Sequence, residues 1–179
     1  MCILIIDGNE KLSKQDKALA ELIHKHSVPY FIVVNKIDLI GETNMKNFKR
    51  SMEIFNQIMP NTPIVYASAL MNKNTKSIKE RMYLMIKTIN KEYKTSFLNK
   101  ILSEAVTKHQ PPLIDNKRTR LKFARQIKSK HLTIEISGTK VDKLPKTYTK
   151  YLLNYFTLHL KIEGIPLRII FTNQKNPFI

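Results

Sequence analysis

The sequence has little cysteine, little glycine and no long hydrophobic run, and each shortage excludes a class of protein. Its single cysteine, Cys2, excludes an internal disulfide bond and is typical of a protein from a reducing cytoplasm. Four glycines among 179 residues exclude an architecture built on repeated glycine turns. No hydrophobic run approaches the roughly 18 residues of a membrane-spanning helix, and the N-terminus has no signal-peptide pattern. We therefore expect a cytoplasmic protein with no membrane partner.

Negative charge is scarce as well. The chain has 14 acidic against 31 basic residues, which gives a net charge of +17. Hydrophobic residues make up 42%, so the chain is able to form a core and is not expected to be disordered. The basic excess is larger in residues 95–179, which contain 16 basic and 5 acidic residues. A charge of this size indicates a nucleic-acid partner.

Residues 1–94 alternate short hydrophobic runs with amphipathic stretches. The three runs are Cys2–Ile6, Tyr30–Val34 and Ile64–Ala67. Each run is typical of a buried parallel strand, and helical spacing of hydrophobic residues follows each of them. This order predicts right-handed crossovers and an α/β fold, with a parallel sheet covered on both faces.

Residues 95–179 have a different pattern, which predicts a small α+β domain. A helix closed by Gln110-Pro111-Pro112 precedes two strand-like stretches, and a second helix beginning at Pro145 precedes a last strand. The three strands are expected at Leu121–Ile127, His131–Ser137 and Leu167–Thr172. No Gly/Ser-rich linker separates the two domains, so we place the boundary between residues 94 and 95 and expect no loose tether.

Asn35-Lys36-Ile37-Asp38 is the most informative motif, because it directly follows a buried strand. Ligands of open α/β sheets bind at the carboxyl ends of the strands. The Asp38 carboxylate is able to accept two hydrogen bonds from the ring N–H and exocyclic amine of guanine, which adenine does not offer. We expect Asn35 to tie neighbouring loops together and the stem of Lys36 to lie across the face of the base.

Ala67-Ser68-Ala69-Leu70 follows the next strand, and the two motifs together resemble the guanine-recognition elements of P-loop GTPases. The resemblance implies that Ala69 offers its backbone N–H to the guanine keto oxygen and that Ser68 shapes the loop. No Gly-x-x-x-x-Gly-Lys-Ser/Thr motif is present, and neither is a switch segment or a magnesium site. We therefore expect weak or negligible nucleotide binding and no useful GTP hydrolysis by this polypeptide alone.

The whole chain resembles the Der (EngA) family of bacterial ribosome-assembly GTPases. Five stretches beyond the guanine motifs carry this resemblance: Leu98–Lys100, His109–Leu113, Leu121–Gln126, Tyr148–Leu152 and Glu163–Phe171. It implies that residues 1–94 are the C-terminal half of a P-loop GTPase domain, an incomplete parallel sheet without P-loop and switches. Residues 95–179 are then a KH-like domain, and the N-terminal GTPase parts of the parent are missing.

The same resemblance implies a function in maturation of the large ribosomal subunit. The partner is then the large subunit or its rRNA, and the cofactor is GTP or GDP. Seven basic residues are the expected contacts with RNA: Lys117, Arg118, Arg120, Lys122, Arg125, Lys128 and Lys130. Because the Gly-x-x-Gly loop of nucleic-acid-binding KH domains is absent, we expect them to contact phosphates rather than to read bases.

Two alternatives remain open at this stage. In the first alternative, the chain is a stand-alone basic module that binds RNA or the ribosome, and its α/β half serves only as a scaffold. An Era-like GTPase also joins a GTPase domain to a KH domain, but the missing Gly-x-x-Gly and the ending Glu163–Phe171 argue against it. The histidines and Cys2 have no metal-ligand spacing, and no arrangement of residues indicates a catalytic site, so we predict neither.

Overall fold

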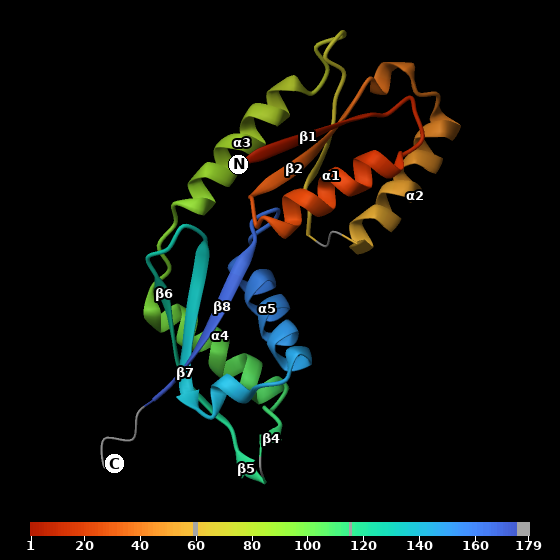
Figure 1. The fold of residues 1–179 in the computed structure, drawn as a ribbon. Coiled ribbons are helices and arrows are strands. Elements are labelled where there is room, and N and C mark those ends of the chain that lie inside the picture. The colour runs from red at the N-terminus through yellow and green to blue at the C-terminus, as the bar shows by residue number, and fades with distance from the viewer. Residues whose placement is uncertain (59–60, 115, 175–179) are drawn as a thin grey trace. The chain divides into compact units, whose positions relative to one another are not determined.

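The structure is a computed structural model that describes residues 1–58, 61–114 and 116–174 (Figure 1). It divides into two compact units. The first contains Met1–Asn90 together with Glu163–Pro166, and the second contains Lys91–Ile162 together with Leu167–Ile179.

Three parallel strands form the sheet of the first unit, in the order β1 (Cys2–Asp7), β2 (Tyr30–Asn35) and β3 (Ile64–Tyr66). Their β-branched and aromatic residues favour this extended conformation. β2 lies in the centre and is buried along nearly its whole length. The register sets Asp7 opposite Asn35, so that the carboxyl ends of β1 and β2 meet at one edge of the sheet.

Three helices and one short 3₁₀ helix complete the described part of the first unit: α1 (Lys14–Lys25), η1 (Ile37–Leu39), α2 (Glu42–Ile58) and α3 (Thr75–Ile89). α1 begins with a capping box, in which the Ser13 hydroxyl accepts the Asp16 N–H at 3.0 Å and the Asp16 carboxylate accepts the Ser13 N–H at 2.9 Å. α3 lies on the other side of the strands from α1 and α2 (Figure 1).

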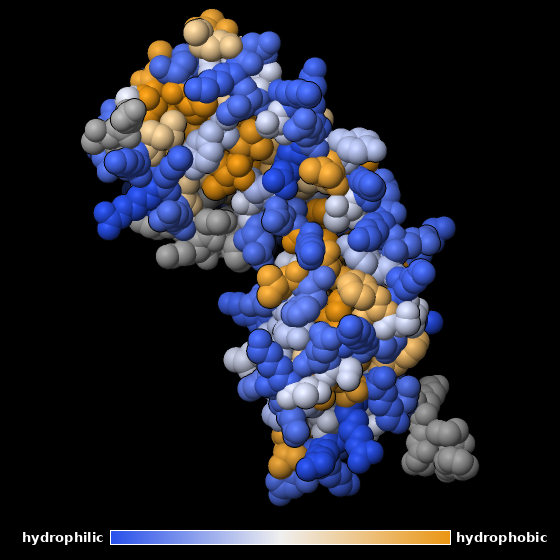
Figure 2. All heavy atoms as spheres, turned by 180° about the vertical axis from the view of Figure 1, so that it is seen from behind, coloured by the Kyte–Doolittle hydropathy of each residue, from blue (hydrophilic) through white to orange (hydrophobic). Residues whose placement is uncertain are grey.

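The core of the first unit lies between the sheet and the first two helices. It is built from Leu4, Ile6, Ala20, Tyr30, Ile32, Val34, Phe48 and Met52. The prediction of a parallel α/β sheet is confirmed. The helices do not cover the sheet evenly, since Ile5 of β1 is 64% exposed. Figure 2 shows hydrophobic side chains gathered on part of the surface of this unit.

Glu163–Pro166 joins the first unit although it follows the rest of that unit by more than seventy positions in the sequence. The carbonyl of Gly164 accepts the Tyr30 N–H at 2.8 Å, and its N–H donates to the Asn61 carbonyl at 2.7 Å. Arg81 forms an ion pair with Glu163 at 3.1 Å. Gly164 has a φ of +65°, which glycine adopts without steric cost.

The second unit contains two helices, one 3₁₀ helix and five strands among its described residues. In chain order they are α4 (Thr95–Lys108), β4 (Leu113–Ile114), β5 (Lys117–Arg118), β6 (Arg120–Ile127), β7 (Leu132–Thr139), η2 (Val141–Lys143), α5 (Lys146–Leu160) and β8 (Leu167–Asn173). β6 and β7 are antiparallel, and β7 and β8 are parallel, in a sheet of order β6-β7-β8. The expected α+β order is confirmed.

Both helices of this unit contribute to its core. Leu98 and Leu102 of α4 and Leu152 and Phe156 of α5 are buried, as is Ile134 of β7. Their hydrophobic residues recur every three or four positions, which gives each helix one buried face. No helix among the described residues is long and apolar enough to cross a membrane.

Candidate functional site

The proposed guanine loops lie at the carboxyl ends of β2 and β3, and one hydrogen bond joins them. Asn35 is the last residue of β2, and its side-chain oxygen accepts the backbone N–H of Ala69 at 3.0 Å. The N–H of Ile37 donates to the carbonyl of Ala67 at 3.3 Å. The structure therefore brings the two motifs together, as we expected from their positions after neighbouring strands.

Ser68 organises the second of these loops from a buried position. Its hydroxyl accepts the Met71 N–H at 3.1 Å. Its backbone N–H and carbonyl pair with the carbonyl and N–H of Lys73 at 3.0 and 2.9 Å. Asn72 and Asn74 both have positive φ, a conformation that asparagine tolerates better than most residues. The loop is thus held by its own hydrogen bonds before any ligand binds.

Lys36 leaves the sheet edge with a φ of +61°, and its ammonium group lies 2.5 Å from the Asp7 carboxylate of β1. The other oxygen of Asp7 accepts the Asn9 N–H at 2.9 Å. The hydrogen bond from Lys36 and then that from Asn9 lower the pKa of Asp7. The same Asp7 contact raises the pKa of Lys36. The sequence did not identify this partner, because only the register between β1 and β2 places Asp7 beside the motif.

Asp38 and Ala69 are both exposed at this edge, so a ligand is able to reach them. An exposed carboxylate fits the two N–H donors of guanine. Because the Ala69 N–H already donates to Asn35, a guanine keto oxygen would have to share it. The contact of Ala69 with the base therefore stays a prediction. A separate cavity of about 560 Å³ beside Gly8–Leu12 and α2 is not lined by any of the five predicted residues.

The seven basic residues of the second unit extend from β5 through β6 to the turn before β7, and all are exposed. Within the described part of the chain, Arg125 alone among them forms an ion pair, with Glu135 at 2.5 Å. Hydrogen bonds from Arg125 and then from Thr172 lower the pKa of Glu135. Hydrophilic side chains cover most of this unit in Figure 2. The other six cations are therefore available to an anionic partner.

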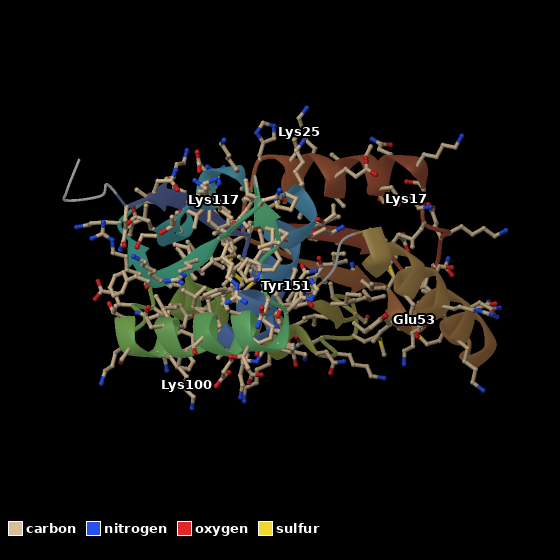
Figure 3. The ribbon with its side chains drawn as sticks, turned by 90° about the horizontal axis from the view of Figure 1, so that it is seen from below. Lys17, Lys25, Glu53, Lys100, Lys117 and Tyr151 are labelled. Carbon is tan, nitrogen blue, oxygen red and sulfur yellow. The ribbon has the colours of Figure 1, made fainter. Side chains whose placement is uncertain are left out.

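Across residues 1–58, 61–114 and 116–174, no group of three or more His, Cys, Asp or Glu side chains is placed to hold a metal ion. Lys100 extends outward from α4, whereas the Tyr151 hydroxyl donates to the carbonyl of Ala105 at 2.8 Å (Figure 3). Tyr151 is thus engaged in packing α5 against α4.

Two family models match the chain. The elongation factor Tu GTP binding domain matches residues 1–90, and the KH-domain-like region at the C-terminus of EngA bacterial GTPase enzymes matches residues 93–172. Among solved structures, Era in complex with MgGDPNP and nucleotides 1506–1542 of 16S ribosomal RNA is 17% identical, with a TM-score of 0.40. That match covers 96% of this chain and 65% of the Era chain.

Sequence relatives carry the name GTPase Der. The protein of Buchnera aphidicola subsp. Schizaphis graminum is 38% identical over 181 residues, covering 100% of this chain and 40% of the relative. That of Hamiltonella defensa subsp. Acyrthosiphon pisum is 36% identical over 180 residues, covering 98% of this chain and 36% of the relative. The chain thus spans about two fifths of the length of these relatives. It belongs to the EngA (Der) family of GTPases: residues 93–172 match the KH-domain-like region of EngA enzymes, and residues 1–90 match a GTP-binding domain.

Proposed function

We propose that the chain supplies the guanine-reading part and the KH-like domain of a GTPase that acts in maturation of the large ribosomal subunit. Residues 1–94 form the guanine-reading domain in this proposal, and residues 95–179 form the domain that contacts rRNA. The site of action is the cytoplasm. The family match supports the GTPase assignment, and the basic excess of residues 95–179 supports the rRNA partner.

The hydrogen bond from the Ala69 N–H to the Asn35 side chain carries the nucleotide part of the proposal. It holds the loop that bears Asp38 against the loop that bears Ala69, so that the acceptor for the two guanine N–H groups and the donor for its keto oxygen are held together. Asp38 would accept the two guanine N–H groups, and the stem of Lys36 would lie on the base. A bound nucleotide brings its own phosphates and magnesium, for which the sequence has no Gly-x-x-x-x-Gly-Lys-Ser/Thr motif.

Titration of the full chain with a fluorescent guanine nucleotide tests this part. We expect saturable binding with a dissociation constant weaker than micromolar, since the base is read but the phosphates are not cradled. Asn35→Ala removes the bond between the loops and should weaken binding by about fivefold. The matched control Asn154→Ala, at an exposed position of α5, should bind like the wild type. Equal binding by Asn35→Ala, or no binding at all, would refute the proposed guanine site, and micromolar or tighter binding would refute the expectation that the phosphates are not held.

A second candidate is a stand-alone RNA-binding module, in which the α/β part is only a scaffold. It is favoured by the exposure of the basic residues and by the absence of carboxylate partners for six of them among the described residues. Both candidates predict that RNA affinity falls steeply with salt, because bound phosphates release counterions. Only the first predicts guanine-selective binding, so the titration above, run in parallel with an adenine nucleotide, separates the two.

A further inference from the structure

A second cavity, of about 670 Å³, lies within the second unit. It forms where α4 ends and the β4–β5 hairpin, which bears the Lys117 labelled in Figure 3, leads into β6. Its volume falls in the range of roughly 300–1,000 Å³ that is usual for sites of small ligands. The guanine loops contribute no residue to its lining, so this cavity is a separate candidate site.

One side of the cavity is cationic. We call Arg118, Arg120 and Lys122 the cation rim, because all three line the cavity and are exposed. None of them forms an ion pair within the described ranges of the chain, and no acidic residue that the structure describes belongs to the lining. The cavity is therefore suited to an anionic ligand.

A β-bulge builds this rim. Leu121 pairs with Gly138 and Phe123 pairs with the neighbouring Ser137, so that Lys122 is the extra residue of β6. A Cβ atom on Gly138 would lie 2.0 Å from the Arg120 carbonyl, which explains why glycine occupies that position. Bulges change the direction of side chains and are frequent beside functional sites.

Hydrophobic residues line the cavity as well. We call Val106, Pro111 and Leu121 the apolar wall, since they line the cavity and are each half-buried. A bare phosphate would gain nothing from such a wall, whereas an unstacked nucleobase buries its faces against apolar or aromatic groups. The combination of the apolar wall and the cation rim matches a nucleotide with both its base and its phosphate.

Thr119 provides a second, independent observation. It lines the cavity between Arg118 and Arg120 and is only 5% exposed. Its hydroxyl oxygen has no hydrogen-bond partner among the residues that the structure describes. Buried hydroxyl groups are nearly always hydrogen-bonded, so this one has hydrogen-bonding capacity left for a polar atom of a ligand.

We propose that this cavity binds one unstacked nucleotide of a single-stranded RNA segment. The base lies on the apolar wall, the adjoining phosphates lie at the cation rim, and the Thr119 hydroxyl bonds a polar atom of the nucleotide. The proposal rests on the RNA contact proposed above and deepens it, because it assigns three of the seven basic residues to the phosphates beside one captured base and leaves Lys117, Lys128 and Lys130 as general phosphate contacts.

Binding of a short labelled single-stranded RNA to the full chain, measured by fluorescence anisotropy over a range of salt concentrations, tests this. Thr119→Val keeps the side-chain shape and removes the hydroxyl, so the dissociation constant should rise about fivefold. The slope of log affinity against log salt should not change, because no charge is lost. Thr119→Ser should restore wild-type affinity. Urea unfolding should show that Thr119→Val is at least as stable as the wild type, since an unpaired hydroxyl is removed.

Arg118→Gln and Lys130→Gln form a matched pair, because each removes one charge from the basic segment. Both should reduce the salt slope by about one, and Arg118→Gln should lose about threefold more affinity at fixed salt. Equal losses in the pair, together with wild-type binding by Thr119→Val, would overturn the cavity proposal and leave the phosphate contact intact. Absence of salt-dependent RNA binding by the wild type would overturn the proposed RNA contact itself.

The source of the nucleotide is tested with two competitors. Free uridine monophosphate should displace the RNA only at concentrations far above those of an unlabelled RNA strand. Displacement at equal nucleotide concentration would overturn the RNA assignment in favour of a free mononucleotide. Polyglutamate that binds with the same dependence on Thr119 would overturn it in favour of an acidic protein partner.

Discussion

Asp38 is the residue on which base choice depends in the proposed guanine site. Its carboxylate is exposed at the carboxyl end of β2, next to a loop that Asn35 fixes to the neighbouring strand. The sequence predicted this role from chemistry alone, because a carboxylate after a buried strand matches two adjacent donors of guanine. The partner of Lys36 could not be predicted in the same way, since Asp7 is distant in the sequence and reaches Lys36 only through strand register.

Asp38→Asn should change the base preference of the site from guanine to xanthine. An amide offers one donor and one acceptor where the carboxylate offers two acceptors, so it matches xanthine rather than guanine. We expect guanosine diphosphate binding to fall at least tenfold, since two charge-assisted hydrogen bonds are weakened, and xanthosine diphosphate binding to rise. Titration of both nucleotides by amide NMR measures this, with Asp142→Asn of η2 as the matched control. Unchanged guanosine preference in Asp38→Asn would exclude Asp38 from the base contact.

Gly164→Ala should destabilise the first unit. The backbone at Gly164 has a φ of +65°, and an added Cβ would lie 2.2 Å from the Tyr30 carbonyl. We expect a loss of about 1–3 kcal/mol in the free energy of unfolding, from backbone strain and displacement of β2. Urea unfolding measures it, and Gly41→Ala is the control because its Cβ would meet no atom within 4 Å. Equal stability of the two variants would mean that the segment around Gly164 yields without cost.

At the scale of elements, hydrophobic patterning predicted the long helices and strands and the short strand β3, but not the two-residue strands β4 and β5. The strands β1, β2, β6 and β7 have enough residues to show a buried run or an alternation. β4 and β5 have two residues each, which is too short for any period, so the hairpin could not be predicted. The cavity at this hairpin could not be predicted from the sequence for the same reason.

The packing of α5 against the end of α4 makes a prediction about alkaline pH. The Tyr148 hydroxyl donates to the His109 carbonyl at 2.8 Å, and burial raises the pKa of Tyr148 to about 12 from 10.0. The unfolded chain therefore loses this proton at a lower pH than the folded chain. Stability from the neutral phenol is complete below pH 10 and is lost as the pH rises toward 12.

Tyr148→Phe tests whether the neutral Tyr148 phenol stabilises the folded chain and whether this stability is lost at alkaline pH. At neutral pH it should lower the free energy of unfolding by about 1 kcal/mol, because the hydrogen bond to His109 is lost. The difference from the wild type should shrink above pH 10, since the phenylalanine has no proton to lose. Urea unfolding at several pH values measures both effects, with Tyr83→Phe on the exposed side of α3 as the control. A difference that stays constant or grows with pH would show that burial does not hold the Tyr148 proton.

At the scale of the whole molecule, composition and motifs together predicted more than either alone. The charge of +17 indicated a nucleic-acid partner but no fold, and the two guanine motifs indicated a GTPase sheet but no partner. Membership of the EngA (Der) family accounts for the GTPase sheet and the KH-like domain in one chain, and the nucleic-acid partner stays a proposal. The assignment of the segment around Gly164 to the first unit could not be predicted from the sequence, because that unit is defined by contacts between positions far apart in the chain.

The most direct test of guanine recognition is an amide NMR titration of the full chain with guanosine diphosphate and, separately, with adenosine diphosphate. The proposed site predicts that guanosine diphosphate shifts the amides of Asn35–Leu39 and Ser68–Leu70, with a dissociation constant weaker than micromolar, and that adenosine diphosphate leaves them unchanged. Equal shifts with both nucleotides, or no shift in either loop at millimolar guanosine diphosphate, would contradict it.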